Sequence, residues 1–275
     1  MSLSPGDLRL HSYYMHENGP ESPILQFISN NVWRATHRDT RVQAGRARSS
    51  WGGPPPPKGP WHRFRSWIDS LPRGVILWGV LALNGAVFVA WHMAWSNYKA
   101  GRDISLVLWM RDNFTVSMNN IKSGRIWTLL TACFSHEDTT HIFFNAFTYY
   151  FMAPSVMSIL GNSAFLALYL GGGLVSSAFS LMWHDYVRHS PGYTSHGASG
   201  AIYAIISFLA CVAPKAQFLF FGVIPIPAWA FVTGVFLYDG YNAVVDKRNG
   251  TDTAGHIGGI LAGIGYYLRL RFRLF

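Results

Sequence analysis

The chain has 275 residues, of which 50% are hydrophobic and only 13% are charged. Soluble domains carry about 25% charged residues, and the deficit is concentrated after residue 74, so we expect a polytopic membrane protein. The formal net charge of +9 would favour nucleic-acid binding in a soluble protein. Here the basic residues flank apolar segments, where they set topology and contact anionic lipid. We therefore expect the lipid bilayer, and no nucleic acid, as a partner.

The N-terminal part differs from the rest of the chain. Residues 1–61 are rich in polar residues, basic residues and prolines, including the run Pro54–Pro57, which is typical of a stiff linker. We predict a poorly ordered basic arm over residues 1–61 and a membrane domain over residues 62–275. The arginine-rich stretch Arg34–Arg48 resembles a mitochondrial transit segment, but acidic residues precede it, so a basic tail near a membrane is the alternative.

Six apolar segments follow, and they predict an all-α protein with six transmembrane helices, since about 20 residues cross a bilayer. The fourth segment has only 15 residues, or about 22 Å of helix against a hydrocarbon core of ~30 Å. One of its ends must therefore lie below the membrane surface. The six segments are Val75–Trp95, His141–Leu160, Ala164–Trp183, Ser199–Ala213, Ala228–Val245 and Ala254–Leu270.

The order of the segments brings three polar residues to one depth. Lys and Arg are more numerous on the side of the two termini, which places both termini inside. The second, fourth and sixth segments then start at the outer side. They begin at or near His141, Ser199 and His256. Ionisable residues in membrane segments are functional candidates.

These residue types suit acyl transfer. Ser199 and His256 lie on different helices and can form a nucleophile and its base, because burial disfavours the charged form of a histidine. His141 and Asn145 are four residues apart, hence on one helix face, and both can donate hydrogen bonds to an oxyanion. The backbone N–H of Ser199 is a further donor, since the first N–H groups of a helix lack partners.

Small residues predict close contact between helices. Gly259 and Gly263 form G-x-x-x-G in the sixth segment, and Gly200 and Ala204 form a small-x-x-x-small pair in the fourth. Such faces let helix backbones approach closely. A short serine side chain and a histidine on neighbouring helices need that approach in order to meet.

Asp239 lies inside the fifth segment, where a buried carboxylate is costly. It either orients His256 as a third catalytic member or is a protonated or paired structural acid. We favour the structural interpretation. It predicts that Asp239→Asn lowers the rate of cleavage by no more than about tenfold. Ser199 also has a structural alternative, because serines in membrane helices often only bond a backbone carbonyl.

Two other motifs do not support their usual functions. The sequence HEDTTH, from His136 to His141, separates its histidines by five residues, which turns them away from each other on a helix and makes a zinc site improbable. The sequence GASGA has Ala201 where G-x-S-x-G requires a second glycine, and no alternation of strands and helices surrounds it.

The remaining motifs are GASG at Gly197–Gly200, GHIGGILAG at Gly255–Gly263 and H-x-x-x-N at His141–Asn145. Together they resemble the motifs of the rhomboid intramembrane serine proteases, and this resemblance implies that no metal and no organic cofactor is needed. The similarity covers about residues 62–270, and it is greatest to the mitochondrial, presenilin-associated rhomboid-like type. Gly255 departs from the family, which usually has alanine before the catalytic histidine.

The resemblance implies a six-helix rhomboid fold and a serine–histidine dyad of Ser199 and His256. It also implies that Tyr203 packs against this histidine and that Gly197 keeps the loop before the serine compact. The first loop, including Ile104–Phe114, would lie in the membrane interface, and the fifth span would form the lateral gate. The substrates would be single-span membrane proteins, in the mitochondrial inner membrane.

Two other functions remain open at this stage. The first is a rhomboid-like protein that binds membrane clients without cutting them, although inactive relatives typically lack the serine or the histidine and this chain keeps both. The second is a small channel or transporter with Asp239 and the histidines along a polar path. That alternative leaves the GASG motif and the oxyanion donors without a purpose.

Overall fold

A computed structural model describes residues 59–272, except residues 191, 221–223 and 246–250. The predicted N-terminal arm therefore lies almost entirely outside the described residues. Its last three residues do not: Gly59 precedes a helix, α3, which spans Pro60–Ser70 and so already includes Pro60 and Trp61. The boundary that we placed after residue 61 thus falls inside the first turn of α3.

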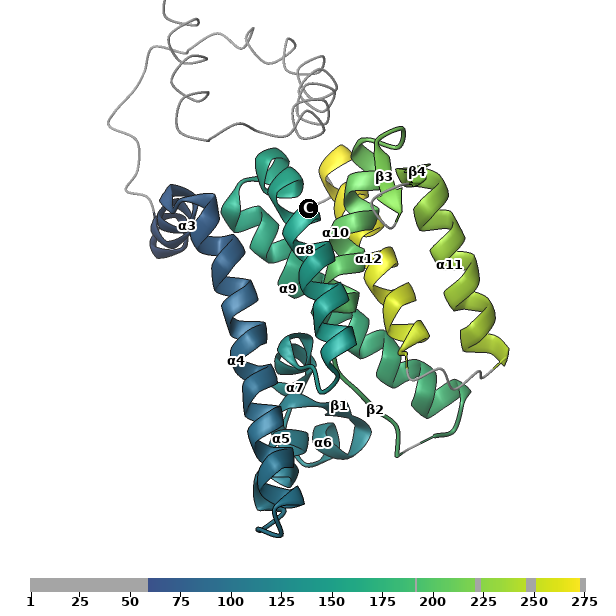
Figure 1. Ribbon diagram of the computed structural model, residues 1–275. Coiled ribbons are helices and arrows are strands. Elements are labelled where there is room, and N and C mark those ends of the chain that lie inside the picture. The colour runs from purple at the N-terminus through teal and green to yellow at the C-terminus, as the bar shows by residue number, and fades with distance from the viewer. Residues whose placement is uncertain (1–58, 191, 221–223, 246–250, 273–275) are drawn as a thin grey trace, which may run out of the picture. The chain divides into compact units, whose positions relative to one another are not determined.

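Six longer helices match the six predicted segments (Figure 1), and the predicted helical membrane fold is confirmed. Among the described residues, three helical segments are long and apolar enough to cross a membrane: Arg73–Lys99, Thr139–Leu160 and Asn162–Val187. The six helices are α4 (Arg73–Lys99), α8 (Thr139–Leu160), α9 (Asn162–Met182), α10 (Ser199–Val212), α11 (Ala228–Val245) and α12 (Thr253–Phe272).

Helix α10 is the centre of the bundle. It contacts α8, α9, α11 and α12, and the four surround it in Figure 1. Ten of its 14 residues are buried, which fits its uniformly apolar composition. Fourteen residues span only about 21 Å, and Pro214 follows shortly after Val212, where proline disfavours continuation of a helix. The prediction of a helix too short to cross the bilayer is confirmed.

Glycines bring the backbones of α10 and α12 into direct contact. A Cβ on Gly259 would lie 2.2 Å from the carbonyl oxygen of Gly200, and one on Gly263 would lie 2.2 Å from that of Ala204. No side chain fits at such distances. The two small-residue motifs therefore face each other, as helix pairs in membranes commonly do.

The segment between α4 and α8 folds beside the ends of the helices. It contains α5 (Ser105–Phe114), α6 (Met118–Lys122), α7 (Thr128–Thr131) and a 3₁₀ turn, η2 (Ala132–Phe134). Within it, β1 (Val116–Ser117) pairs antiparallel with β2 (Thr194–Ser195). This short ladder ties the first loop to the chain just before Ser199.

Two further elements complete the fold. Helix α9 continues into a π-helical turn, η3 (Trp183–Val187). Between α10 and α11, β3 (Gln217–Phe220) pairs antiparallel with β4 (Ile224–Pro227). This hairpin lies at the opposite end of α10 from Ser199.

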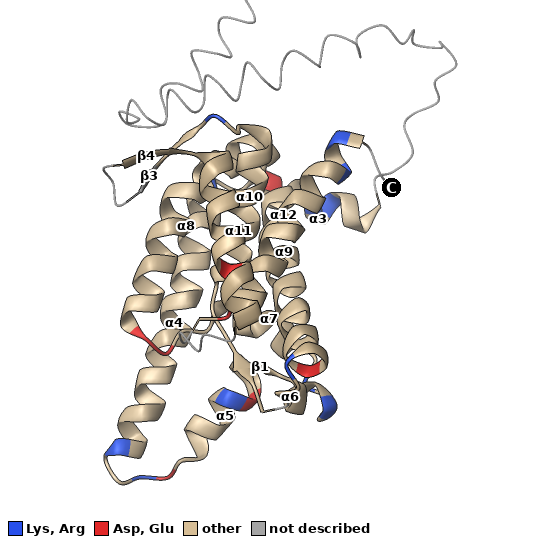
Figure 2. Cartoon of the chain, turned by 90° about the vertical axis from the view of Figure 1, so that its right-hand side faces the viewer, with Lys and Arg blue, Asp and Glu red and all other residues tan. Residues whose placement is uncertain are grey.

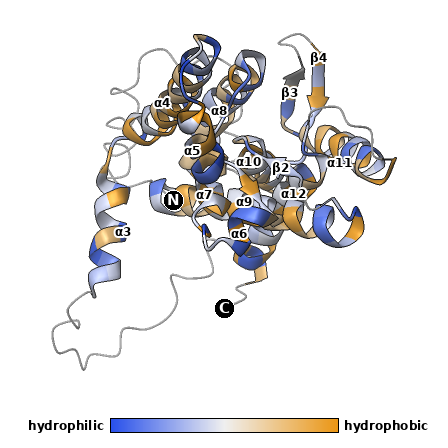
Figure 3. Cartoon of the chain, turned by 90° about the horizontal axis from the view of Figure 1, so that it is seen from below, coloured by the Kyte–Doolittle hydropathy of each residue, from blue (hydrophilic) through white to orange (hydrophobic). Residues whose placement is uncertain are grey.

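The outer surface of the bundle is apolar, while the charged residues gather mainly towards its two ends (Figure 2). Exposed aromatic residues run along α8, among them Phe143, Phe147 and Phe151. Large hydrophobic residues are also exposed along α4 and α11, and the hydrophobic residues of both helices are coloured orange in Figure 3. Large exposed apolar areas are rare on soluble monomers, and here they form the surface that faces lipid.

We predict that Gly259→Ala destabilises the bundle, because the added methyl group would press on the Gly200 carbonyl. Overpacking of this kind costs about 1–3 kcal/mol, which thermal unfolding in detergent will report as a lower transition temperature. The matched control is Gly265→Ala in the same helix, where nothing lies within 4 Å of an added Cβ. Equal transition temperatures for the two variants would contradict the close contact of α10 and α12.

Candidate active site

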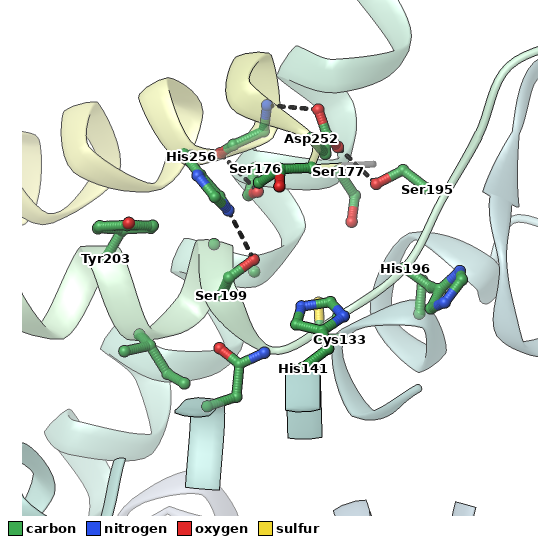
Figure 4. Close-up of a pocket in the computed structure, with 18 of the residues that line it drawn as sticks. Cys133, His141, Ser176, Ser177, Ser195, His196, Ser199, Tyr203, Asp252 and His256 are labelled. Carbon is green, nitrogen blue, oxygen red and sulfur yellow. Dashed lines mark hydrogen bonds between the residues drawn. The ribbon is translucent and has the colours of Figure 1, made fainter. Parts of the chain in front are cut away.

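Ser199 and His256 meet at the point where α10 and α12 are closest. Ser199 is the first residue of α10 and His256 lies in the first turn of α12. The Ser199 Oγ is 3.0 Å from the His256 Nε2, and Figure 4 shows the two side chains pointing towards each other. The histidine is only 7% exposed. The geometry is that of a hydroxyl donating a hydrogen bond to a ring nitrogen.

Asp239 of α11 occupies the other side of the same histidine. Its Oδ2 lies 3.0 Å from the His256 Nδ1, and Asp239 is only 3% exposed. The three side chains therefore form a continuous chain from Ser199 through His256 to Asp239. The sequence could not place Asp239 relative to His256, and this contact is the feature that distinguishes its two interpretations.

Tyr203 lies one turn after Ser199 and covers the histidine ring. The centroids of the Tyr203 and His256 rings are 4.5 Å apart, with an angle of 51° between their planes. This is the packing that the family resemblance implies. Ring contact on one side and Asp239 on another restrict the orientation of His256.

His141 contacts the loop that precedes the serine. Gly197 has φ +134°, a conformation that L side chains rarely adopt, and a Cβ there would lie 2.8 Å from the His141 Cε1. The same Cβ would lie 3.8 Å from the Ser199 Oγ. The glycine thus lets the ring of His141 lie beside the nucleophile. The side-chain of Asp138 accepts a hydrogen bond from the His141 N–H at 2.8 Å and caps the start of α8.

Asn145 takes part in a buried hydrogen-bond network with His136, a residue whose role the sequence did not predict. Its Nδ2 lies 3.0 Å from the Nε2 of His136, and the backbone N–H of Ala198 donates to the same nitrogen at 3.2 Å. An amide N–H only donates, so Nε2 carries no proton and also accepts from Asn145. His136 is fully buried, and it links an oxyanion candidate to the residue before Ser199.

The neutral state of His136 follows from its surroundings. Burial is the main cause that lowers its pKa from 6.5 to about 3, and the nearby His141 and His196 add to the effect. The sequence signal for His136 was its place five residues before His141. That spacing bears on zinc binding and does not predict the hydrogen bonds of His136. Among the described residues, no three His, Cys, Asp or Glu side chains are grouped to hold a metal.

Asp252 connects the loop before Ser199 to the start of α12. Its Oδ1 accepts a hydrogen bond from the Gly255 N–H at 2.8 Å, and its Oδ2 accepts one from the Ser195 hydroxyl, as Figure 4 shows. A Cβ on Gly255 would lie 2.6 Å from the Asp252 Oδ2. The glycine that departs from the family pattern therefore leaves room for this carboxylate.

The reactive groups open into one cavity of about 560 Å³. Its volume exceeds that of a single water many times, so solvent and a peptide segment both have room. Asp239, Gly259 and Gly263 are not part of the lining, and they act behind it as partner of His256 or as packing residues. Predicted site residues that line the cavity are Gly197, Ser199, Gly200, Tyr203, His256, His141 and Asn145.

The fold and the cavity together define a helical membrane protein with a serine and a histidine paired inside the bundle. The chain belongs to the rhomboid family: the Rhomboid domain profile matches residues 123–272, which is more than half of the chain. The resemblance seen in the motifs is confirmed. The family is one of intramembrane proteases, and the protein is a mitochondrial integral membrane protein.

Several curated proteins are similar to this chain. It is 29% identical over 221 residues to RHOMBOID-like protein 12, mitochondrial, of Arabidopsis thaliana, covering 76% of this chain and 62% of that protein. It is 28% identical over 231 residues to Presenilin-associated rhomboid-like protein A, mitochondrial, of Danio rerio, covering 75% and 55%. Rhomboid protein 1, mitochondrial, of Saccharomyces cerevisiae is 27% identical over 206 residues, covering 74% and 56%. The chain thus matches a little over half of each relative's length.

We predict that the buried His136 makes the fold acid-sensitive. Its pKa is 6.5 when exposed and about 3 in the fold, so the unfolded chain binds the extra proton between these values. Stability is complete above pH 6.5 and falls as the pH drops towards 3, by up to about 1.4 kcal/mol per pH unit. Thermal unfolding in detergent across this range will measure the loss.

The matched variant for this prediction is His136→Gln. Its side-chain carbonyl keeps an acceptor for the Asn145 and Ala198 donors but has no proton to gain. We expect His136→Gln to reduce the acid sensitivity relative to the unmodified chain. An unchanged dependence of the transition temperature on pH would show that His136 is not its source.

Proposed function

We propose that this chain is an intramembrane serine endopeptidase. The observation that carries the proposal is the 3.0 Å contact between the Ser199 Oγ and the His256 Nε2 in a cavity within a bundle of apolar helices. A buried pair of this kind is the arrangement of an activated nucleophile and its base. The membership of the chain in the rhomboid family supports the same activity.

The reaction follows from the positions of the two side chains. The Ser199 Oγ attacks the carbonyl carbon of the scissile peptide bond while the His256 Nε2 accepts the hydroxyl proton. The tetrahedral intermediate then collapses, the C–N bond breaks, and His256 gives the proton to the leaving amine. Water, activated by His256 in the same way, hydrolyses the acyl ester and restores the serine.

The negative charge of the tetrahedral oxygen requires donors on the cavity wall. His141 and Asn145 both line the cavity, and the Asn145 amide has two hydrogens, of which one binds His136. The second hydrogen is available to the oxyanion, together with the Ser199 N–H at the start of α10. His136 acts as a positioning residue, because it holds the Asn145 amide and the Ala198 N–H against one fixed nitrogen.

We assign Asp239 as the third member of the catalytic group. With its Oδ2 3.0 Å from the His256 Nδ1, the carboxylate accepts a hydrogen bond from the Nδ1–H and so holds the tautomer in which Nε2 is free to act as the base. It also stabilises the imidazolium that forms during the reaction. This assignment replaces the structural interpretation that we favoured from the sequence.

The position of the nucleophile limits the substrate class. Helix α10 begins at Ser199 and is too short to cross the bilayer, and we propose that the end below the outer surface of the membrane is the one that carries Ser199. A substrate must present an extended peptide at that depth, because helical backbone hides its carbonyl groups. Single-span membrane proteins of the mitochondrial inner membrane, with a helix-breaking segment near that surface, fit this requirement.

We predict that purified protein in detergent reacts with a fluorophosphonate probe and cleaves a model transmembrane substrate. Ser199→Ala and His256→Ala should abolish both reactions, because each removes one side of the 3.0 Å contact. The matched control is Ser158→Ala: Ser158 lies in α8, where its hydroxyl bonds the carbonyl oxygen of Ser155. This variant should label and cleave like the unmodified chain.

Two outcomes would contradict the protease assignment. Full activity in Ser199→Ala would place the nucleophile elsewhere. Absence of both labelling and cleavage in folded, unmodified protein would instead favour a protein that binds membrane clients without cutting them.

We predict that Asp239→Asn lowers kcat by a factor of roughly a hundred to ten thousand, since an amide at this position stabilises the wrong tautomer of the histidine. The measurement is the steady-state rate of substrate cleavage as a function of pH. Asp239→Glu keeps a carboxylate and should retain more activity than Asp239→Asn. A loss within about tenfold for Asp239→Asn would restore the interpretation of Asp239 as a structural acid.

A further inference from the structure

Helix α3 (Pro60–Ser70) lies outside the six-helix core and has two unlike faces. Trp61, Phe64 and Trp67 are 74%, 50% and 58% exposed. Their rings form a connected row, with centroids 5.9 Å and 6.1 Å apart between successive members. Figure 3 shows polar and apolar residues interleaved along this helix, which at helical spacing produces an amphipathic element.

The helix is fixed to the membrane domain by its last residues and the start of α9. The Asp69 Oδ1 accepts the Ser163 N–H at 2.8 Å, and its Oδ2 accepts the Ser163 hydroxyl at 2.8 Å. The Asn162 Nδ2 donates to the carbonyl oxygens of Ile68 and Leu71, at 3.1 and 2.7 Å. These contacts set the direction of α3 relative to the bundle, so its aromatic row has a defined position.

The aromatic row is exposed while the end of α3 packs on the bundle. Ile68 and the following Leu71 pack against the main core, whereas Trp61, Phe64 and Trp67 remain exposed. The large hydrophobic side chains that are exposed next in the sequence are Val75 and Trp78 of α4, at 51% and 61%. Tryptophan and other amphipathic aromatic residues concentrate at the boundary between acyl chains and headgroups.

Basic residues surround this row. Arg63 and Arg65 lie on the polar side of α3, and Arg73 begins α4. Arg269 and Arg271 lie in the last turn of α12, which is at the same end of the bundle because the Tyr266 hydroxyl bonds the carbonyl of Ala164 in α9. Figure 2 shows basic residues on α3 at that end. The single acid of α3, Asp69, accepts two hydrogen bonds from Ser163 and lies 3.9 Å from the Arg65 Nε. The Arg65 Nε also donates to the Ser163 hydroxyl at 3.2 Å, so part of the charge of Arg65 is balanced within the protein.

We propose that α3 is an in-plane membrane helix that binds anionic phospholipid headgroups. Its aromatic row enters the boundary of the acyl chains while the arginines bind the phosphate groups. The leaflet is the one opposite to the active-site cavity, because α3 lies at the end of α8 and the start of α9, whereas His141 and Ser199 lie at the other ends of their helices. This role is independent of the proposed protease activity.

The test uses the full chain in nanodiscs that contain phosphatidylcholine and phosphatidylglycerol. Cys211 is partly exposed and is replaced by alanine, whereas Cys133 is buried and is kept. A bimane label is then attached to a single introduced cysteine. The three labelling sites are Trp67→Cys in the aromatic row, Ser66→Cys on the polar side of α3 and Val89→Cys on the exposed surface of α4. Brominated acyl chains, carried by only one of the two lipids, quench a label that they contact. Iodide quenches a label that water reaches.

We expect brominated lipid to quench the label at residue 67 and iodide to quench the label at residue 66. At residue 67, brominated phosphatidylglycerol should quench more than brominated phosphatidylcholine at equal mole fraction, whereas at residue 89 the two should be equal. Arg63→Glu should lower the preference at residue 67 about fivefold, since a basic residue near an anionic leaflet contributes about 1 kcal/mol. Arg63→Lys and the distant Lys122→Glu should preserve it.

Three results would overturn the proposal. Quenching of residue 67 by iodide and not by lipid would place α3 in water. Protection from both quenchers, with crosslinking between labelled chains, would show that a second copy covers the aromatic row. Equal quenching by the two brominated lipids at residue 67 would remove the selectivity for anionic headgroups.

Discussion

The contact between the backbones of α10 and α12 is the constraint on which the rest of the site depends. Gly259 and Gly263 of α12 lie against the carbonyl groups of Gly200 and Ala204, with no room for a side chain between them. Only at this separation does the short side chain of Ser199 reach a histidine on the neighbouring helix. A packing feature, common in membrane proteins, therefore determines the chemistry that is possible here.

The polar groups around Ser199 and His256 are held by the buried His136 and the partly buried Asp252. His136 accepts hydrogen bonds from Asn145 and from the backbone of Ala198, and Asp252 binds Ser195 and the Gly255 N–H. Buried polar groups are costly unless they are paired. Each pairing satisfies one such group and at the same time fixes the loop before Ser199, so stability and orientation of the nucleophile have the same source.

The protein uses its two surfaces differently. Towards lipid it exposes large apolar side chains along α4, α8 and α11, and at one end it carries the aromatic row and arginines of α3. Towards its interior it gathers serine, histidine and carboxylate groups around a cavity of about 560 Å³. Both Ser199 and His256 line this cavity, at the end of the bundle where α10 begins.

The sequence alone determined the class of the protein and most of its site. Apolar length and periodicity predict helices from local composition, so the six segments agree with the structure to within a few residues, and connectivity placed His141, Ser199 and His256 at one depth. Partners of side chains depend instead on the rotation of each helix and on contacts between distant segments. For that reason only the tertiary structure placed Asp239 against His256, assigned His136 as the shared acceptor of Asn145 and Ala198, and brought the Asp252 carboxylate next to Gly255. The same holds for α3, since its short polar sequence predicts no membrane span. Its orientation comes from contacts of Ile68, Asp69 and Leu71 with Asn162 and Ser163, which lie more than 90 residues further along the chain.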